Sequence, residues 1–184
     1  YCCLLKANRF NIVHDRQRMD RKKQEDPVEV NYNCALCAFK ELLRRQNQNL
    51  VALPDKYHPN YDLGAIHQAQ LEMSRTREII AEIHDKRGEL NEAYRFLVDA
   101  LRSKEEILDP ADPDFFSTLN ALASVCSRCY MHEEALAAME KATSAAEMLF
   151  GETSSAMATQ LFFMGLTLFR IGTIEGKEKD KESM

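Results

Sequence analysis

The sequence is poor in the residues that break or bend a chain and in bulky aromatic side chains. Its 184 residues include six glycines, five prolines and no tryptophan, and aromatic residues make up 8%. This composition excludes collagen-like and low-complexity chains and argues against a loop-rich β-sandwich. The length suits one domain, with or without tails, that can bury a hydrophobic core.

Long apolar stretches are also missing. The longest strongly apolar run covers residues 161–169, far short of the ~20 residues that cross a bilayer. The sequence therefore predicts no transmembrane span. The apolar start at residues 1–5 is too short for a signal peptide. Of the six cysteines, four fall in segments with helical periodicity, so we expect reduced thiols and an intracellular, most simply cytoplasmic, location.

Positive charge is scarce outside the first quarter of the chain. The net charge is −5, yet residues 1–47 carry ten basic and six acidic side chains. A basic arm over residues 1–27 holds most of this excess, and it lacks the interleaved aromatic residues that stack on bases. Nucleic-acid binding is therefore not expected, and the arm is interpreted as a docking or solubilising segment.

Signatures of catalysis are absent from the sequence. There is no glycine-rich phosphate loop and no Gly-x-Ser-x-Gly elbow, and the five histidines have no metal-ligand spacing. The two Cys-x-x-Cys pairs, at 34/37 and 126/129, are too far apart for a two-pair zinc site and fall in helical segments. We therefore expect no catalytic residue, no metal and no cofactor, and packing roles for these cysteines.

A repeat of 42 residues is the most informative feature that is present. The segment 88–93 aligns with 130–135, and the same offset keeps large and small residues in phase over three units. The aligned series are Ile80, Leu122 and Met164; Ala81, Ala123 and Gly165; His84, Cys126 and Leu168; Gly88, Tyr130 and Gly172. Such a period predicts a stack of similar structural units.

Each unit reads as a pair of antiparallel helices. In the second unit the apolar spacing predicts helices over residues 114–130 and 133–150, with Asp112 or Asp114 as an N-cap. Gly88, Gly151 and Gly172 stand where helices are expected to end. The first helix of the first unit is expected to start after residues 58–59 and to run some 28 residues. A further helix is predicted over residues 28–47, followed by a loop over 48–60.

These motifs carry a family resemblance. Leu-x-x-Leu-Ala-x-x-Cys at 119–126, Glu-Glu-Ala-Leu at 133–136 and Met-x-x-Ala at 139–142 resemble the tetratricopeptide repeat. The 42-residue period and the segment 100–123 are similar to the kinesin-light-chain type. The resemblance implies an all-α fold, a short right-handed superhelical stack of antiparallel hairpins, over residues 58–172. It implies no particular partner, because the matching positions are packing positions.

The chain is accordingly divided into four segments. They are the basic arm (1–27), an N-terminal helix and loop (28–57), the helical repeats (58–172) and a charged tail that we expect to be disordered (173–184). The third unit has a recognisable first helix but no recognisable second one. In that helix, Leu161, Met164, Gly165 and Leu168 are expected to pack inward against the preceding pair.

Taken with the resemblance, the sequence predicts a non-catalytic adaptor or scaffold, or a structural subunit of a larger assembly. Another protein is expected to bind the concave groove and the aromatic C-terminal helix, whose exposed apolar end it would cap. The residues predicted to contact it are Asn120, Ser124, Arg128, Phe162, Leu166, Phe169 and Arg170.

A second resemblance leads to a different class of protein. Residues 133–136 and 164–172 are similar to the C-terminal helical domain of lysine methyltransferases that have SET and MYND domains. Residues 32–37 resemble part of the zinc motif that precedes that domain, although a cysteine is missing and no SET sequence is present. On this alternative the chain is the accessory part of an enzyme.

Overall fold

The computed structural model describes residues 27–54, 58 and 61–182, and all regular structure in that part of the chain is α-helical. The helices are α2 (Pro27–Val51), α3 (Leu63–Lys86), α4 (Leu90–Glu105), α5 (Pro113–Arg128), α6 (His132–Phe150) and α7 (Ser155–Glu182). The predicted all-α class is thereby confirmed. The basic arm lies outside the described residues, except for Pro27 at the start of α2.

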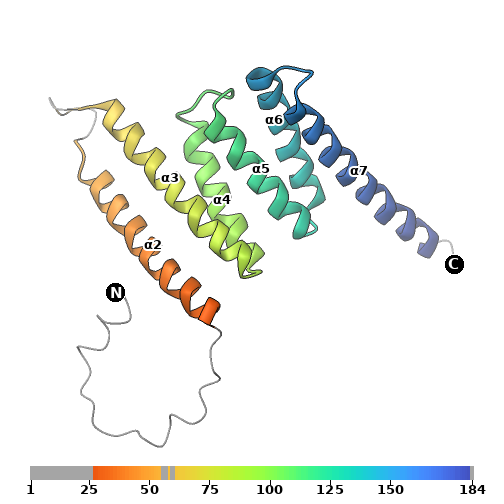
Figure 1. Cartoon of the computed structure of the whole chain (residues 1–184), viewed down its shortest axis with the longest axis horizontal. Coiled ribbons are helices and arrows are strands. Elements are labelled where there is room, and N and C mark those ends of the chain that lie inside the picture. The colour runs from red at the N-terminus through yellow and green to blue at the C-terminus, as the bar shows by residue number, and fades with distance from the viewer. Residues whose placement is uncertain (1–26, 55–57, 59–60, 183–184) are drawn as a thin grey trace, which may run out of the picture.

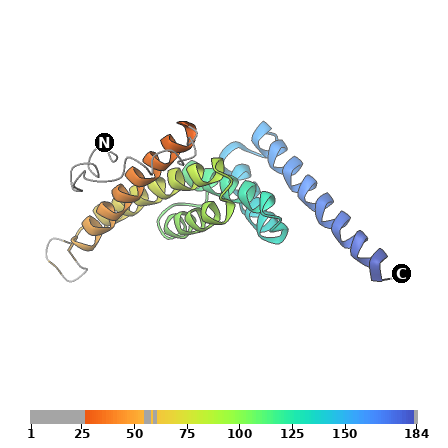
Figure 2. The same ribbon diagram turned by 90° about the horizontal axis from the view of Figure 1, so that it is seen from below.

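The helices follow one another in a row, in chain order, with α2 at one end and α7 at the other (Figure 1). Every helix packs against the next one along the chain, and short turns join α3 to α4 and α5 to α6. The view from below shows the same succession, with α7 reaching away from the other helices (Figure 2). The arrangement is that of a helical repeat, in which each unit contacts only its neighbours.

The signals read from the sequence locate most helix ends. Asp112 is the N-cap of α5: its carboxylate accepts a hydrogen bond from the Asp114 N–H at 2.7 Å, and Pro113 occupies the first turn. Gly151 ends α6 with φ of 82°. The helix α3 is shorter than expected, since it begins at Leu63 with Asp62 as its N-cap. The helix α2 extends to Val51, four residues beyond its predicted end.

The turn inside each hairpin repeats at the predicted interval. Gly88 and Tyr130, which are 42 residues apart, both have left-handed backbones, with φ of 75° and 61°. Around each of them the chain makes the same hydrogen bond across six residues. These bonds run from the Glu89 N–H to the His84 carbonyl (2.9 Å) and from the Met131 N–H to the Cys126 carbonyl (3.0 Å). The offset found in the sequence is therefore an offset in backbone geometry as well.

One continuous apolar core joins α3 to α6, and a smaller cluster joins α2 to α3. Small residues at equivalent positions, Ala81 with Ala93 and Ala123 with Ala135, are almost completely buried in the main core. They let the two helices of each hairpin approach closely. Leu36, Ile80 and Ile83 form the smaller cluster.

The buried face of α7 differs from the predicted one. Leu161 and Leu168 remain 52% and 49% exposed and Gly165 is exposed, so only Met164 of the four expected residues contacts the core. Gln160 and Thr167 are buried instead. The reason is that Leu119, Ala123 and Cys126, the equivalents in α5, face the second helix of their own hairpin. In the described chain no helix follows α7 to cover that face.

The helix α7 also continues past its predicted end. Gly172 was expected to stop it, yet the helix extends to Glu182, through most of the segment for which the sequence predicted a disordered tail. Glutamate and lysine, which dominate residues 175–182, are good helix formers, and no proline follows position 113. Gly172 lies in this helix with no neighbouring atom within 4 Å of a Cβ position. The helix continues through this glycine because the residues that follow it favour the helical conformation.

Candidate functional site

Two cavities open between the first helices of successive hairpins. The α3–α5 cavity has a volume of about 410 Å³ and the α5–α7 cavity about 340 Å³. The polar residues around the first are Arg75, Glu78, Glu82, Asp85, Ser117 and Ser124. The second is lined by Asn120, Ala123, Ser124, Ser127, Arg128, Met139, Thr159, Gln160, Phe163, Leu166, Thr167 and Arg170. Ser124 lines both, so the cavities adjoin across α5.

The second cavity is the first one repeated. When the eleven residues of the α3–α5 cavity are shifted by 42 positions, nine of them become residues of the α5–α7 cavity. Glu78 maps to Asn120, for example, and Ser117 to Thr159. Most wall positions of the two cavities are therefore equivalent, and at these positions the cavities differ in side-chain chemistry.

Polar contacts between the first helices repeat in the same way. The Thr118 hydroxyl of α5 donates to the Glu78 carboxylate of α3, and one repeat later Gln160 Nε2 of α7 donates to Asn120 Oδ1 of α5 at 2.7 Å. At the other end of the helices, Arg128 pairs with Asp85. Its equivalent Arg170 donates to the Ser127 hydroxyl at 3.0 Å. These contacts hold α3, α5 and α7 in equivalent relative positions.

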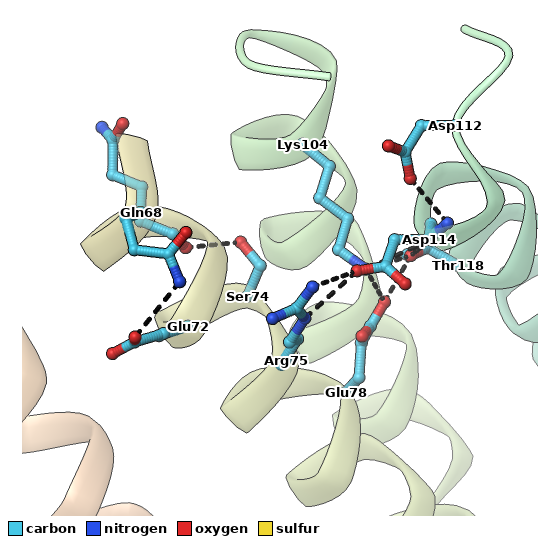
Figure 3. A network of polar contacts seen from close by, with 10 residues as sticks. Gln68, Glu72, Ser74, Arg75, Glu78, Lys104, Asp112, Asp114 and Thr118 are labelled. Carbon is cyan, nitrogen blue, oxygen red and sulfur yellow. Dashed lines mark hydrogen bonds and ion pairs between the residues drawn. The ribbon is translucent and has the colours of Figure 1, made fainter. Parts of the chain in front are cut away.

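A buried lysine contacts Glu78, one of the residues of the first cavity (Figure 3). The Lys104 side chain, from α4, is 1% exposed, and its ammonium group donates to Glu78 Oε1 at 2.6 Å and to Thr118 Oγ1 at 2.9 Å. Its third contact is the Asp114 carbonyl at 3.2 Å. All three donors of the ammonium group are thus used, as a buried charge requires. The network ties α3, α4 and α5 together.

A second ion pair closes the rim of this cavity. Arg75 Nη2 lies 2.6 Å from Asp114 Oδ2. The hydrogen bond from this guanidinium lowers the pKa of the Asp114 carboxyl group, and the carboxylate in turn raises the pKa of Arg75. Because both side chains are about half exposed, the pair positions the start of α5 more than it stabilises the fold.

The two cavities offer different chemistry to a ligand. The first contains three carboxylates from α3, those of Glu78, Glu82 and Asp85, and each of them is paired with a cation of the chain. At the equivalent positions the second has the uncharged side chains of Asn120, Ser124 and Ser127, and its opposite wall contains Phe163 and Leu166. Within the described part of the chain Arg170 pairs with no carboxylate, whereas Arg128 pairs with Asp85. Along one face of the molecule, therefore, a cavity lined by paired charges is followed by a cavity with uncharged and apolar walls and an arginine at its end.

Five of the seven residues predicted to contact a partner lie together in the α5–α7 cavity. They are Asn120, Ser124, Arg128, Leu166 and Arg170. The other two, Phe162 and Phe169, are outside it: they project from another side of α7, where they are 67% and 70% exposed. The predicted set thus divides between a groove and a separate apolar surface.

The prediction missed several cavity residues on α7. Thr159, Gln160, Phe163 and Thr167 line the α5–α7 cavity but were not chosen. A signal for three of them was present in the repeat, because Thr159, Phe163 and Thr167 are one period after Ser117, Ala121 and Val125 of the first cavity. Gln160 had no such signal, since its equivalent Thr118 does not line the first cavity.

Three of the four cysteines of the two pairs lie in helices, as expected, whereas Cys129 is the C-cap that follows α5. Cys34 and Cys37 lie on α2, and Cys126 is buried on α5 at a core position of the repeat. Burial raises the pKa of the Cys126 thiol to about 12, which keeps it protonated and a poor nucleophile. Across the residues that the structure describes, no three His, Cys, Asp or Glu side chains come together as metal ligands could.

No family model matches the chain, and none of the curated proteins matches its sequence. Within the described residues, no helix combines the length and the apolar character that crossing a membrane requires.

Proposed function

We propose that this protein is a non-catalytic adaptor of the tetratricopeptide type, a right-handed stack of helix hairpins that binds an extended segment of another protein. The observation that carries the proposal is the repetition of one cavity along one face, between α3 and α5 and again between α5 and α7. Successive equivalent cavities suit a ligand that is itself periodic, and an extended peptide is such a ligand.

The spacing and chemistry of the cavities define the partner segment. Neighbouring first helices are bridged by long side chains, so they lie at least as far apart as the roughly 8–10 Å of packed helices, which is the length of three extended residues or more. A basic or amide side chain suits Glu82 of the first cavity, because the ion pair of this carboxylate with Lys86 is exposed to solvent. An apolar side chain some three residues away suits the second cavity, beside Phe163 and Leu166. A carboxylate beyond it would meet Arg170, which donates to a serine hydroxyl.

A second surface of the proposed adaptor is the exposed side of α7. Phe162 and Phe169 stand there among other exposed apolar residues, and a patch of this kind marks an interface. The adaptor therefore has two contact surfaces, a groove for a peptide and an apolar helix face for a folded partner.

The groove is tested with one substitution that reaches both cavities. Ser124 is exposed and lines both, so Ser124→Phe fills the junction without disturbing the core. A matched control is Ala137→Phe, on an exposed position of α6 outside either cavity. The probes are labelled peptides with a lysine and a leucine three residues apart, tested with scrambled versions by fluorescence anisotropy.

We expect the spaced peptides to bind in preference to the scrambled ones. Ser124→Phe should weaken that binding at least about tenfold, because a lost cavity contact of one to a few kcal/mol corresponds to that factor or more. Ala137→Phe should bind like the wild type. Equal binding of scrambled peptides, or full binding by Ser124→Phe, would contradict the proposal.

A further inference from the structure

The exposed face of α7 has a regular pattern. Over residues 158–172, small residues recur every seven positions and are flanked on one side by leucines and on the other by phenylalanines. The small residues are Ala158, Gly165 and Gly172; the flanking pairs are Leu161 with Phe162 and Leu168 with Phe169. At 100° per residue these seven positions cover about 120° of the helix surface. All seven are exposed in the structure.

Nothing within the described chain explains the glycines of this face. A Cβ atom added to Gly165 or Gly172 would meet no neighbouring atom within 4 Å, so neither glycine makes room for a contact of its own chain. A glycine inside a helix costs about 1 kcal/mol relative to alanine. What two such glycines allow is the close approach of another backbone from outside.

The repeat identifies the kind of element that fits this face. On α3 and α5 the equivalent face, centred on Ala81 and Ala123, is covered by the following helix of the hairpin, which places Ala93 or Ala135 in the same core. The occupant expected on α7 is therefore also a helix, with a small residue facing Gly165 and apolar residues on either side.

We propose that the occupant is the α7 helix of a second copy of this chain, packed antiparallel with Gly165 at the twofold axis. The pattern is nearly symmetric about that residue. Reversing it puts Leu161 of one copy level with Phe169 of the other and Phe162 level with Leu168. Because the twofold axis keeps each side of the seam together, Leu161 packs against Leu168 and Phe162 against Phe169, so every apolar position meets another. A surface that is its own complement is what a twofold dimer needs.

The size of the face agrees with a reversible dimer. The exposed parts of its leucine and phenylalanine side chains, doubled over two copies, amount to on the order of 1,000 Å² of buried surface, the lower end for a specific interface. An interface of this size fits a dissociation constant in the micromolar range. None of the seven positions of the face belongs to the α5–α7 cavity, so the proposed dimer leaves the residues of that cavity free.

Because this dimer fills the α7 surface of the proposed adaptor and leaves its groove free, association and peptide binding are separate readouts. The first experiment is sedimentation equilibrium of the chain at concentrations from about 1 to about 100 μM, which bracket the dissociation constant expected for an interface of this size. We expect dimers in the wild type and monomers in Leu161→Glu/Phe169→Glu, which places like charges opposite each other. Val51→Glu, at an exposed apolar position on α2, is the matched control and should remain dimeric.

A charge-reversed partner makes the association test specific. Leu161→Lys/Phe169→Lys should also be monomeric alone, and mixing it with the glutamate variant should restore a dimer. A monomeric wild type at every concentration overturns the inference, and so does a dimer that survives both double substitutions. Circular dichroism of each variant checks that the helices are intact. Peptide binding by the monomeric variants tests the groove independently, so either proposal can fail without the other.

Cysteine cross-linking determines the register. Gly165→Cys lies near the proposed axis and should form a disulfide with its own copy under mild oxidation. Ala158→Cys should not, because the two copies of that position would be about 21 Å apart. Ala158→Cys mixed with Gly172→Cys should cross-link. The linked peptides are identified by mass spectrometry against the unsubstituted chain. Self-linking of Ala158→Cys, or no linking of Gly165→Cys, would overturn the antiparallel register.

Discussion

Tyr130 adopts a backbone conformation that its side chain does not favour. Its φ is 61°, in the left-handed region, and its side chain is 81% exposed, with one edge-on ring contact to His132. The equivalent residue of the preceding hairpin is Gly88, for which this region carries no steric penalty. The second turn therefore makes the same geometry as the first with a less suitable residue.

Replacing this tyrosine with glycine is expected to stabilise the protein. Tyr130→Gly removes a left-handed conformation that costs a non-glycine residue about 1–2 kcal/mol, and the exposed ring gives up little. We expect the free energy of unfolding in urea, followed by circular dichroism, to rise by about 1 kcal/mol.

The reciprocal change is the control. A Cβ at Gly88 would meet no neighbouring atom of the described chain within 4 Å, so Gly88→Tyr reports the backbone cost alone. It should lower the free energy of unfolding by a similar amount. Unchanged or reduced stability in Tyr130→Gly would show that the ring contact outweighs the backbone strain.

At the scale of the element, the helices α3, α4 and α5 are joined by a buried ion pair that α5, α6 and α7 do without. Glu78, Lys104 and Thr118 make the first junction. The equivalent residues of the second are Asn120, Ala146 and Gln160, where an amide hydrogen bond at 2.7 Å replaces the charges. The chain thus contains both the charged junction and a neutral alternative of the same shape.

Removing one charge of this junction should cost more than replacing the whole set. Lys104→Met leaves the Glu78 carboxylate with no cation in a mostly buried position, and we expect the free energy of unfolding to fall by about 3 kcal/mol. The triple change Glu78→Asn/Lys104→Ala/Thr118→Gln copies the second junction and should recover most of that loss. Urea unfolding measures both. A triple variant no more stable than Lys104→Met would contradict this expectation.

The sequence predicts the ends of the helices better than it predicts which side of each helix is buried. Capping residues and glycines are local, so Asp112 and Gly151 placed the ends of α5 and α6 correctly. Which side of a helix is buried is not local. Leu161 and Leu168 have the periodicity of a buried face, but burial also needs a second helix, and none of the described chain covers them. For the same reason, the residues predicted to contact a partner are divided between the α5–α7 cavity and the exposed face of α7.

At the scale of the whole molecule, the helices form a row in which only neighbours along the chain pack extensively (Figure 1). Stability in such an array is a sum of local contributions, and one end can loosen while the other stays folded. The small cluster at one end, around Leu36, touches the main core that joins α3 to α6 through Phe96, which packs against both.

A cavity made at one end should therefore have a local effect. Leu36→Ala removes a large buried side chain, at a cost of about 3 kcal/mol. We expect faster amide hydrogen exchange in α2 and α3 and unchanged exchange in α6 and α7, as measured by mass spectrometry. Met139→Ala, in the main core, is the control and should accelerate exchange in α5 to α7. Equal acceleration throughout the chain after Leu36→Ala would indicate one cooperative unit instead.

The equivalence of the two cavities makes the recognition surface modular. Each step from one first helix to the next presents largely the same set of positions, so the groove, if it binds a peptide as proposed, would contact that peptide at fixed intervals. What it accepts at each interval is set by a few side chains, Glu82 at one step and Ser124 at the next. Exchanging such residues between steps would exchange the preferences of the two intervals. Specificity in this molecule can therefore change one interval at a time, while the spacing that the helices impose stays the same.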